Sequence, residues 1–179
     1  KNLSQDTIIN LEIKSTPDEK NLTPGPKEMV QIVLNDIKKS NLQDKIIISS
    51  FDWRILREVK NQSPEISRAY LTFQQEKGMK IKKTIYSKSP WIDHIPLTIV
   101  YDLPKIIKEL GGSAWHPYYK DINKKAVKDA HDYNLPVNVW TVNDEYNMLK
   151  MIEYEVDGIM TDYPLKLKEL CDKKNIKWF

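Results

Sequence analysis

The side chains with the clearest chemical potential are two charged residues on one short apolar segment. Glu12 and Lys14 alternate with Leu11 and Ile13 within residues 9–14. The period of two predicts a strand with both charges on one side and the apolar residues facing helices. Charges inside a fold are unfavourable unless they pair or bind an ion. Two interpretations follow: an ion pair on a solvated strand face, or a divalent-metal carboxylate beside a phosphate-binding lysine.

Polar side chains also follow three later apolar runs. Ser50 and Asp52 end the second predicted strand, but no histidine or G-x-S-x-G turn accompanies them, so we interpret Ser50 as site lining. In parallel βα units the functional groups lie beyond the carboxyl ends of the strands. By that rule, the residues expected to face the site from the last two strands are Trp140, Thr141, Asn143, Thr161 and Asp162.

The three histidines offer no strong general acid or base. His131 lies in a predicted helix and is expected at the surface, and His94 lies in a lysine-rich segment where a solvated side chain is expected. His116 ends a predicted strand, next to Trp115, and is expected to line the mouth of the site. Proton transfer needs a group with a pKa near the working pH at hydrogen-bonding distance from the phosphate.

Strand and helix patterns alternate along the chain, which indicates a parallel sheet covered by helices. An open doubly wound sheet shares this local pattern, but no glycine-rich phosphate loop follows any strand. Between residues 73 and 96 the alternation breaks in an excursion with five lysines, two prolines and Trp91. The predicted strands are Thr7–Lys14, Ile46–Phe51, Ser67–Thr72, Gly112–His116, Val137–Val142 and Gly158–Thr161. The predicted helices begin at Pro26 or span Trp53–Lys60, Leu103–Leu110, Asp121–Asn134, Asp144–Glu155 and Leu165–Lys173.

Bulk properties narrow the functional class. The 179 residues fit one domain with a sizeable core, and 28 basic against 25 acidic residues argue against a nucleic-acid partner. No apolar run reaches the length of a membrane helix, and the chain opens without a signal-peptide pattern. The lone Cys171 is expected as an inert core thiol and favours a reducing compartment. We therefore expect a cytoplasmic location.

Four segments together resemble the glycerophosphodiester phosphodiesterase family. Val137–Asn143 and Asp157–Pro164 are similar to its closing V-x-V-W-T-V-N and D-G-I-x-T-D-Y-P segments. Ile9–Lys14 resembles its I-E-x-K strand, and Ile48–Asp52 resembles its S-F-D strand end. The segments occur in the family's order, so the resemblance spans about residue 7 to residue 170.

The resemblance implies an α/β, (β/α)8 TIM-barrel-like fold, of which residues 1–179 look like the C-terminal two-thirds in one incomplete domain. It implies metal-dependent hydrolysis of a small-molecule glycerophosphodiester to an alcohol and glycerol 3-phosphate. Glu12 matches a ligand of Mg²⁺ or Ca²⁺, and Lys14 matches a residue that contacts the phosphate. Trp140 matches an apolar wall beside the glycerol or leaving group. Further substrate-binding candidates are Ser50, Trp115 and His116.

The sequence also departs from the family. The H-R-G, E-x-D and H-D motifs, which lie upstream of I-E-x-K in the family, are absent. One alternative is therefore a catalytically silent scaffold or binding module. Another is a phospholipase-D-like enzyme acting on phospholipids, for which the basic segment Lys77–Trp91 would face a membrane surface. An incomplete barrel would also leave two exposed edge strands, which predicts self-association.

Overall fold

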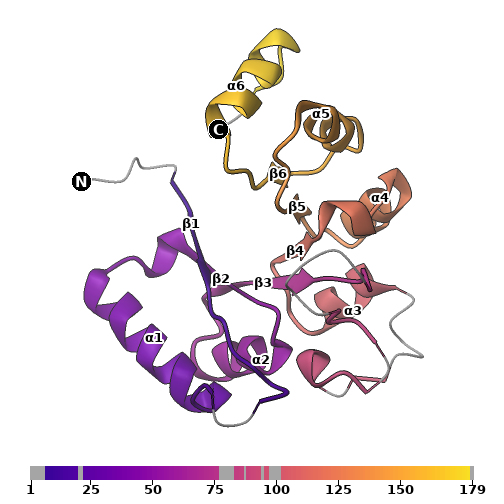
Figure 1. Ribbon diagram of the computed structural model, residues 1–179. Helices are drawn as coiled ribbons and strands as arrows, with labels where there is room; N and C mark the ends of the chain where they lie inside the picture. Colours follow the sequence, from indigo (N-terminus) through magenta and orange to yellow (C-terminus); the bar gives the residue numbers. More distant parts are fainter. Residues whose placement is uncertain are drawn as a thin grey trace.

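The computed structural model describes residues 7–19, 22–76, 83–86, 88–93, 95–96 and 102–177. Six parallel strands follow one another in chain order, with the helices on the outside of the arc that they form (Figure 1). The strands of the larger sheet are β1 (Ile9–Glu12), β2 (Ile46–Ser50), β3 (Ser67–Thr72) and β4 (Ala114–Pro117). The smaller sheet pairs β5 (Asn138–Val139) with β6 (Gly158–Ile159). Single bridges at Trp115–Val137 and Tyr118–Trp140 connect β4 to β5.

Each strand is followed by a helix whose start is encoded locally. Proline occupies the first turn of several helices, where its missing N–H costs nothing. Asp52, Asp102, Asn123 and Asp144 each accept a backbone N–H as helix N-caps. The helices are α1 (Pro26–Ser40), α2 (Trp53–Gln62), α3 (Leu103–Glu109), α4 (Lys124–Asp132), α5 (Glu145–Glu153) and α6 (Pro164–Lys173). Short 3-10 turns cover Gln43–Lys45, Pro90–Ile92 and Tyr119–Asp121.

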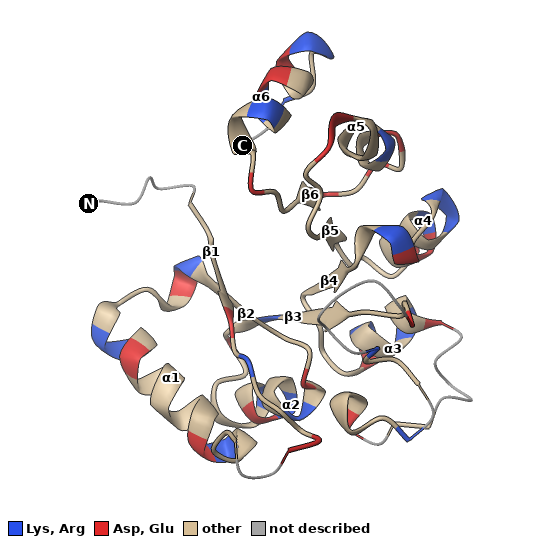
Figure 2. Cartoon of the chain, in the orientation of Figure 1, with Lys and Arg blue, Asp and Glu red and all other residues tan. Residues whose placement is uncertain are grey.

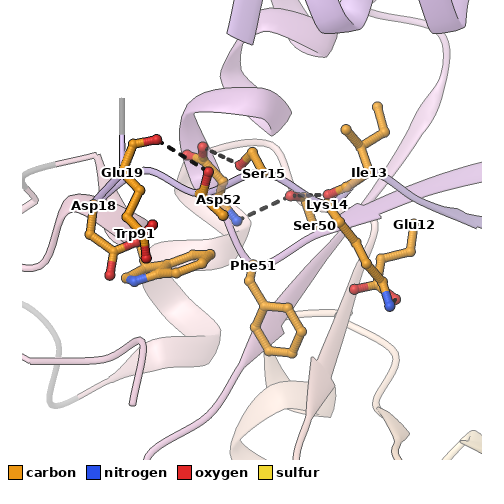
Figure 3. Close-up of a pocket in the computed structure, with 11 residues that line it drawn as sticks. Glu12, Ile13, Lys14, Ser15, Asp18, Glu19, Ser50, Phe51, Asp52 and Trp91 are labelled. Carbon is orange, nitrogen blue, oxygen red and sulfur yellow. Dashed lines mark hydrogen bonds and ion pairs between the residues drawn. The ribbon is translucent and has the colours of Figure 1, made fainter. Parts of the chain in front are cut away.

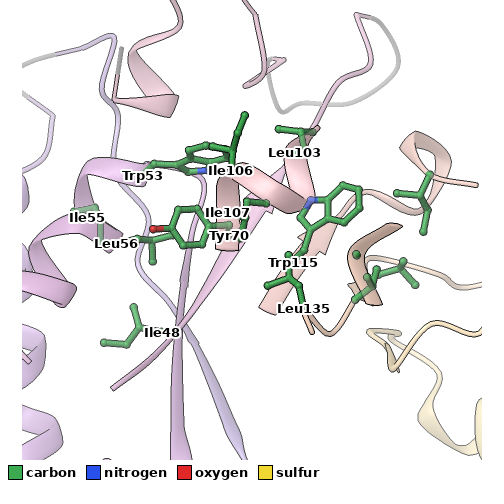
Figure 4. Close-up of a cluster of buried hydrophobic side chains, with 14 of the residues drawn as sticks. Ile48, Trp53, Ile55, Leu56, Tyr70, Leu103, Ile106, Ile107, Trp115 and Leu135 are labelled. Carbon is green, nitrogen blue, oxygen red and sulfur yellow. The ribbon is translucent and has the colours of Figure 1, made fainter. Parts of the chain in front are cut away.

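The core lies between the strands and the surrounding helices. Ile48 of β2 is fully buried in the same hydrophobic cluster as Ile55 and Leu56 of α2, and Trp53 meets Tyr70 edge to face at 5.1 Å (Figure 4). Gly112 allows the chain to enter β4 tightly, since a Cβ there would lie 2.8 Å from a backbone oxygen of α3. The packing fixes the carboxyl ends of β1 to β4 relative to one another.

The predicted elements are all present. β3 has the predicted bounds, α2 and α6 are slightly longer, β4 is shifted toward the C-terminus, and most of the others are shorter. β5 and β6 contain two residues each, because pairing beyond them is limited to single bridges and isolated backbone hydrogen bonds. Helix α4 begins after Asp121, since Tyr119–Asp121 forms a separate turn and Asn123 caps the helix. Part of the predicted excursion packs on the fold, where the Thr84 amide donates to the Phe73 carbonyl at 2.9 Å. His94 and residues 77–82 lie outside the described residues.

Both ends of the strand series are open within the part of the chain that the structure describes. β1 pairs with β2 alone, and β6 pairs with β5 alone. The inner sides of the two terminal strands approach each other where the Asn10 amide lies 4.0 Å from the Met160 sulfur. None of the described helices is long and apolar enough to cross a membrane.

Candidate active site

Charged side chains on the inner side of β1 face a cavity at the carboxyl ends of β1 and β2. Glu12 and Lys14 are exposed, whereas Leu11 and Ile13 point to the helices, as the alternation predicts. The Lys14 Nζ lies 3.6 Å from Glu12 Oε2, and the Lys14 side chain is 79% exposed. Both residues line a cavity of about 270 Å³ together with residues of the β2 end (Figure 3). A cation and a carboxylate therefore lie side by side at the opening, and Figure 2 shows an acidic and a basic residue close together at the end of β1.

Asp52 is the most heavily bonded side chain at this cavity, and it is completely buried. The Arg54 guanidinium donates to both of its oxygens, from Nε at 2.9 Å and from Nη2 at 2.8 Å. The Ser15 hydroxyl donates to Asp52 Oδ2 at 2.7 Å. The hydrogen bond to Asp52 raises the pKa of Arg54 above its ordinary value. Asp52 thus joins the loop after β1 to the start of α2.

Ser50 lines the cavity with a hydroxyl that already has two partners. Its Oγ donates to the Ile13 carbonyl at 2.8 Å and accepts from the Asp52 amide at 3.1 Å. The side chain is 1% exposed. These bonds tie the ends of β1 and β2 together beneath the cavity.

An aromatic cluster covers the carboxyl ends of the middle strands. The Trp140 ring centroid lies 5.3 Å from those of Phe51 and Tyr118, and the Phe73 centroid lies 5.2 Å from that of Tyr118. Trp140 is 7% exposed, and its indole N–H donates to the His116 carbonyl at 2.8 Å. Phe51 is half-buried and lines the cavity, so it connects the cluster to the site.

Trp115 and His116 are not at the mouth, contrary to the expectation from the sequence. Trp115 is in the main core and donates from its indole to Thr72 Oγ1 at 2.9 Å. His116 is 1% exposed, with Nε2 3.0 Å from the Asn138 amide nitrogen. Burial lowers the pKa of His116 to about 4. The reason is that β4 pairing continues to Tyr118, so both residues lie deeper than the strand end.

Three of the other predicted polar residues, Asn143, Thr161 and Asp162, bond one another. Asp162 accepts from the Asn143 side-chain amide at 2.7 Å, and Thr161 donates to Asn143 Oδ1 at 3.2 Å, so both residues bond the loop after β5. Thr141 is exposed. His131 lies at the surface as expected, 2.8 Å from an Asp157 oxygen.

The described residues do not form a complete metal site. Mg²⁺ and Ca²⁺ take at least about six oxygen ligands, with carboxylates prominent among those from protein. Among the residues with described positions, no group of three or more His, Cys, Asp and Glu side chains could hold an ion. Glu12 supplies one carboxylate at the cavity, and Lys14 is its near neighbour.

Ser15 and Phe51 line the cavity and Arg54 pairs with Asp52, but none of the three is among the site residues predicted from the sequence. Asp52 and Arg54 are two residues apart at a strand-to-helix junction, a spacing that allows both a helix cap and an ion pair. That spacing could have identified Arg54 as a partner of Asp52. Ser15 lies 37 residues from Asp52, and no local pattern in the sequence indicates that the two side chains meet.

Comparison with known proteins gives a consistent result. Residues 1–166 match the Glycerophosphoryl diester phosphodiesterase family. A glycerophosphodiester phosphodiesterase of Caldanaerobacter subterraneus subsp. tengcongensis is 31% identical over 170 residues, which cover 94% of this chain and 57% of that protein. A glycerophosphodiester phosphodiesterase of Bacillus altitudinis is 24% identical over 167 residues, which cover 90% of this chain and 56% of that protein. The chain therefore spans little more than half the length of these curated relatives.

Solved structures agree on the fold. A putative glycerophosphoryl diester phosphodiesterase from Silicibacter pomeroyi is 30% identical with a TM-score of 0.76, over 96% of this chain and 52% of that one. A phosphodiesterase from Oleispira antarctica was solved in complex with the product sn-glycerol-3-phosphate. It is 21% identical with a TM-score of 0.66, and the match covers 92% of this chain and 55% of that chain. The strands and helices of this chain are thus a large part of a TIM-barrel-like fold.

Proposed function

Because this chain belongs to the glycerophosphoryl diester phosphodiesterase family, we propose that it forms part of an enzyme that hydrolyses glycerophosphodiesters to an alcohol and glycerol 3-phosphate. The observation that carries this proposal is the placement of Glu12 and Lys14 side by side at the carboxyl end of β1, where both line the cavity. A relative in complex with glycerol 3-phosphate supports the product class.

Within this proposal, Lys14 binds the phosphate. Its ammonium group is largely exposed to the cavity and carries a compact positive charge. Such a charge stabilises the negative charge that builds on phosphate oxygens as the alcohol leaves. Phe51 offers an apolar surface in the same cavity for the carbon skeleton, with Trp140 packed behind it.

The histidines with described positions do not carry out the proton transfers of the proposed hydrolysis. His116 is buried with a pKa of about 4, and His131 is at the surface beside Asp157. Neither lines the cavity. We assign acid–base chemistry to the histidines that the family carries in its upstream H-R-G and H-D motifs.

We also propose that Glu12 contributes one oxygen ligand to a divalent cation, Mg²⁺ or Ca²⁺, whose remaining ligands come from outside the described residues. The cation would neutralise phosphate charge as a Lewis acid. Titration calorimetry with MgCl₂ and CaCl₂ tests this. Glu12→Gln should abolish or strongly weaken binding, whereas Glu28→Gln on α1 should bind like the parent protein. Equal affinities for the parent and Glu12→Gln proteins would remove Glu12 from the metal site.

The function itself is tested by glycerol 3-phosphate release from glycerophosphocholine, measured together with the intact mass of the purified natural protein. Turnover by a protein well above 21.1 kDa would support the hydrolase with its upstream motifs. A 21.1 kDa protein without turnover or divalent-cation binding would support a silent scaffold instead. In such a scaffold the contact between Glu12 and Lys14 would be an ion pair on a solvated strand face and not part of a phosphate site.

A lipid substrate is the other alternative, and Trp91 is the residue that favours it. Trp91 is half-buried and lines the cavity with Glu12 and Lys14 (Figure 3). An enzyme acting at a membrane surface would bind anionic liposomes and lose that binding on Trp91→Ala. Hydrolysis of soluble glycerophosphodiesters without liposome binding would exclude it.

A further inference from the structure

We propose that Ser50 and Asp52 are positioning residues, which hold Ile13 and Ser15 and thereby fix Lys14 at the cavity. This inference rests on the proposed function, in which Lys14 receives the phosphate. The only side-chain ion pair described for Lys14 is the contact with Glu12 at 3.6 Å. An exposed pair of this kind stabilises a conformation weakly. The position of Lys14 therefore has to come from the backbone around it.

Both chain neighbours of Lys14 are anchored to the end of β2. The Ile13 amide donates to the Ser49 carbonyl at 2.9 Å, and its carbonyl accepts from the Ser50 hydroxyl at 2.8 Å. On the other side, the Ser15 hydroxyl donates to Asp52 at 2.7 Å. Figure 3 shows the contacts of Ser15 with Asp52 and of Ser50 with Ile13 and Asp52, with Lys14 beside Ser50 among the residues that line the cavity. Lys14 thus extends from a segment that is tied on both sides.

The anchor is itself rigid. The Asp52 carboxylate is fully buried and paired with Arg54 through two hydrogen bonds, and its amide donates to Ser50. Hydrogen bonds with a charged partner are stronger than neutral ones, and a two-point contact also fixes direction. The two anchors are joined through the Asp52 amide and act as one unit.

Capping of α2 does not account for the contact with Ser15. The Arg54 amide, which is the cap contact, and Arg54 Nε both meet Asp52 Oδ1. The Ser15 hydroxyl meets the other oxygen, Oδ2, which Arg54 Nη2 also contacts. The cap contact thus uses Oδ1, whereas Oδ2 bonds both the Arg54 guanidinium and the loop after β1. Removing the Ser15 hydroxyl breaks the link to Lys14 and leaves the cap and the ion pair in place.

The test is Ser15→Ala in the full chain, with Ser15→Thr as the variant that keeps the hydroxyl. Ser40→Ala is the matched control, because it removes a similar hydroxyl that bonds the Ile37 carbonyl at the end of α1. Hydrogen–deuterium exchange of the peptide covering residues 13–18 is the first readout, since local opening is reported there without any ligand. We expect faster exchange of this peptide in Ser15→Ala alone. Its thermal midpoint should fall by only about 2–4 °C, the shift expected for loss of one hydrogen bond, because Arg54 still bonds both Asp52 oxygens. Unchanged exchange in that peptide overturns the inference whether or not the protein is active.

The second readout is affinity for glycerol 3-phosphate, measured by calorimetry. Loss of one positioning hydrogen bond should weaken binding about three- to tenfold in Ser15→Ala. In a Lys14→Ala background the same substitution should have no further effect, because its influence passes through Lys14. If Ser15→Ala weakens binding of glycerol 3-phosphate equally in the parent and in the Lys14→Ala protein, the inference is overturned. If the parent protein neither binds nor hydrolyses its substrates, the proposed function fails, and the exchange experiment still decides the positioning role.

Discussion

At the scale of single residues, Lys14 is the side chain whose loss should affect chemistry most and stability least. Its side chain is 79% exposed and contributes little to packing. Lys14→Ala should lower kcat/KM at least about 100-fold, by analogy with removal of a donor that stabilises developing negative charge. The thermal midpoint should not move. Steady-state kinetics and calorimetry check both.

A charge-matched control is available on α1, where Lys39 is 78% exposed and pairs with Asp36. Lys39→Ala should retain full activity. If Lys14→Ala is as active as Lys39→Ala, Lys14 does not bind the phosphate.

His116 should make the fold sensitive to acid. Burial lowers its pKa to about 4, whereas the unfolded chain titrates near 6.5. Above pH 6.5 the imidazole is neutral in both states and has no effect. As pH falls from 6.5 to about 4, the unfolded state takes up a proton that the folded state refuses. The resulting loss of unfolding free energy is about 3 kcal/mol.

Urea unfolding at pH 7, 5.5 and 4.5 measures this loss. His116→Gln should be less stable than the parent at pH 7 but should lose about 2 kcal/mol less between pH 7 and 4.5. His131→Gln is the control, because that histidine is at the surface. Identical pH dependence in the parent and His116→Gln proteins would contradict the assignment.

At the scale of elements, two helix N-caps with different surroundings should contribute different amounts to the free energy of unfolding. Asp52 caps α2, is fully buried and also holds Arg54 and Ser15, whereas Asp144 caps α5 at the surface. Asp144→Ala should cost about 1 kcal/mol, the usual value of a cap. Asp52→Ala should cost about 3 kcal/mol, because it also breaks a largely buried pair. Urea denaturation compares them, and equal costs would mean that the buried contacts add nothing.

The order and type of the elements could be predicted because each depends on neighbouring residues. The alternation in residues 9–14 was enough to place Glu12 and Lys14 on one side of β1. How deep a residue lies depends instead on strands far away in the chain. His116 and Trp115 were expected at the mouth, but pairing of β4 continues past them to Tyr118.

The anchoring of the site could not be predicted for the same reason. A period of two says which side of a strand a residue occupies and nothing about its distant partner. The contact between Ser15 and Asp52 joins the ends of two different strands, and it exists only once those strands are paired.

At the scale of the whole molecule, the two open strands should cause self-association. Within the described residues β1 and β6 each have one unpaired side, and Ile8 beside β1 is 61% exposed. Unpaired edges offer free N–H and C=O groups to other chains. The 179-residue chain should therefore form dimers or larger species at micromolar concentration in multi-angle light scattering. Ile8→Lys should shift the distribution toward monomer, and Leu165→Lys on α6 should not. A monodisperse monomer for the unaltered chain would contradict this prediction.

The agreement between strand order and chain order also has a consequence for how the protein is made. Each strand from β2 to β4 pairs with the strand before it, and β6 pairs with β5. During synthesis the ribosome releases the chain from its amino end, at about 5–20 residues per second. When a strand emerges, the strand with which it pairs has therefore already been synthesised. Its pairing covers the open edge of that preceding strand. A growing chain built in this way presents a single advancing edge on its carboxyl side at any moment of translation.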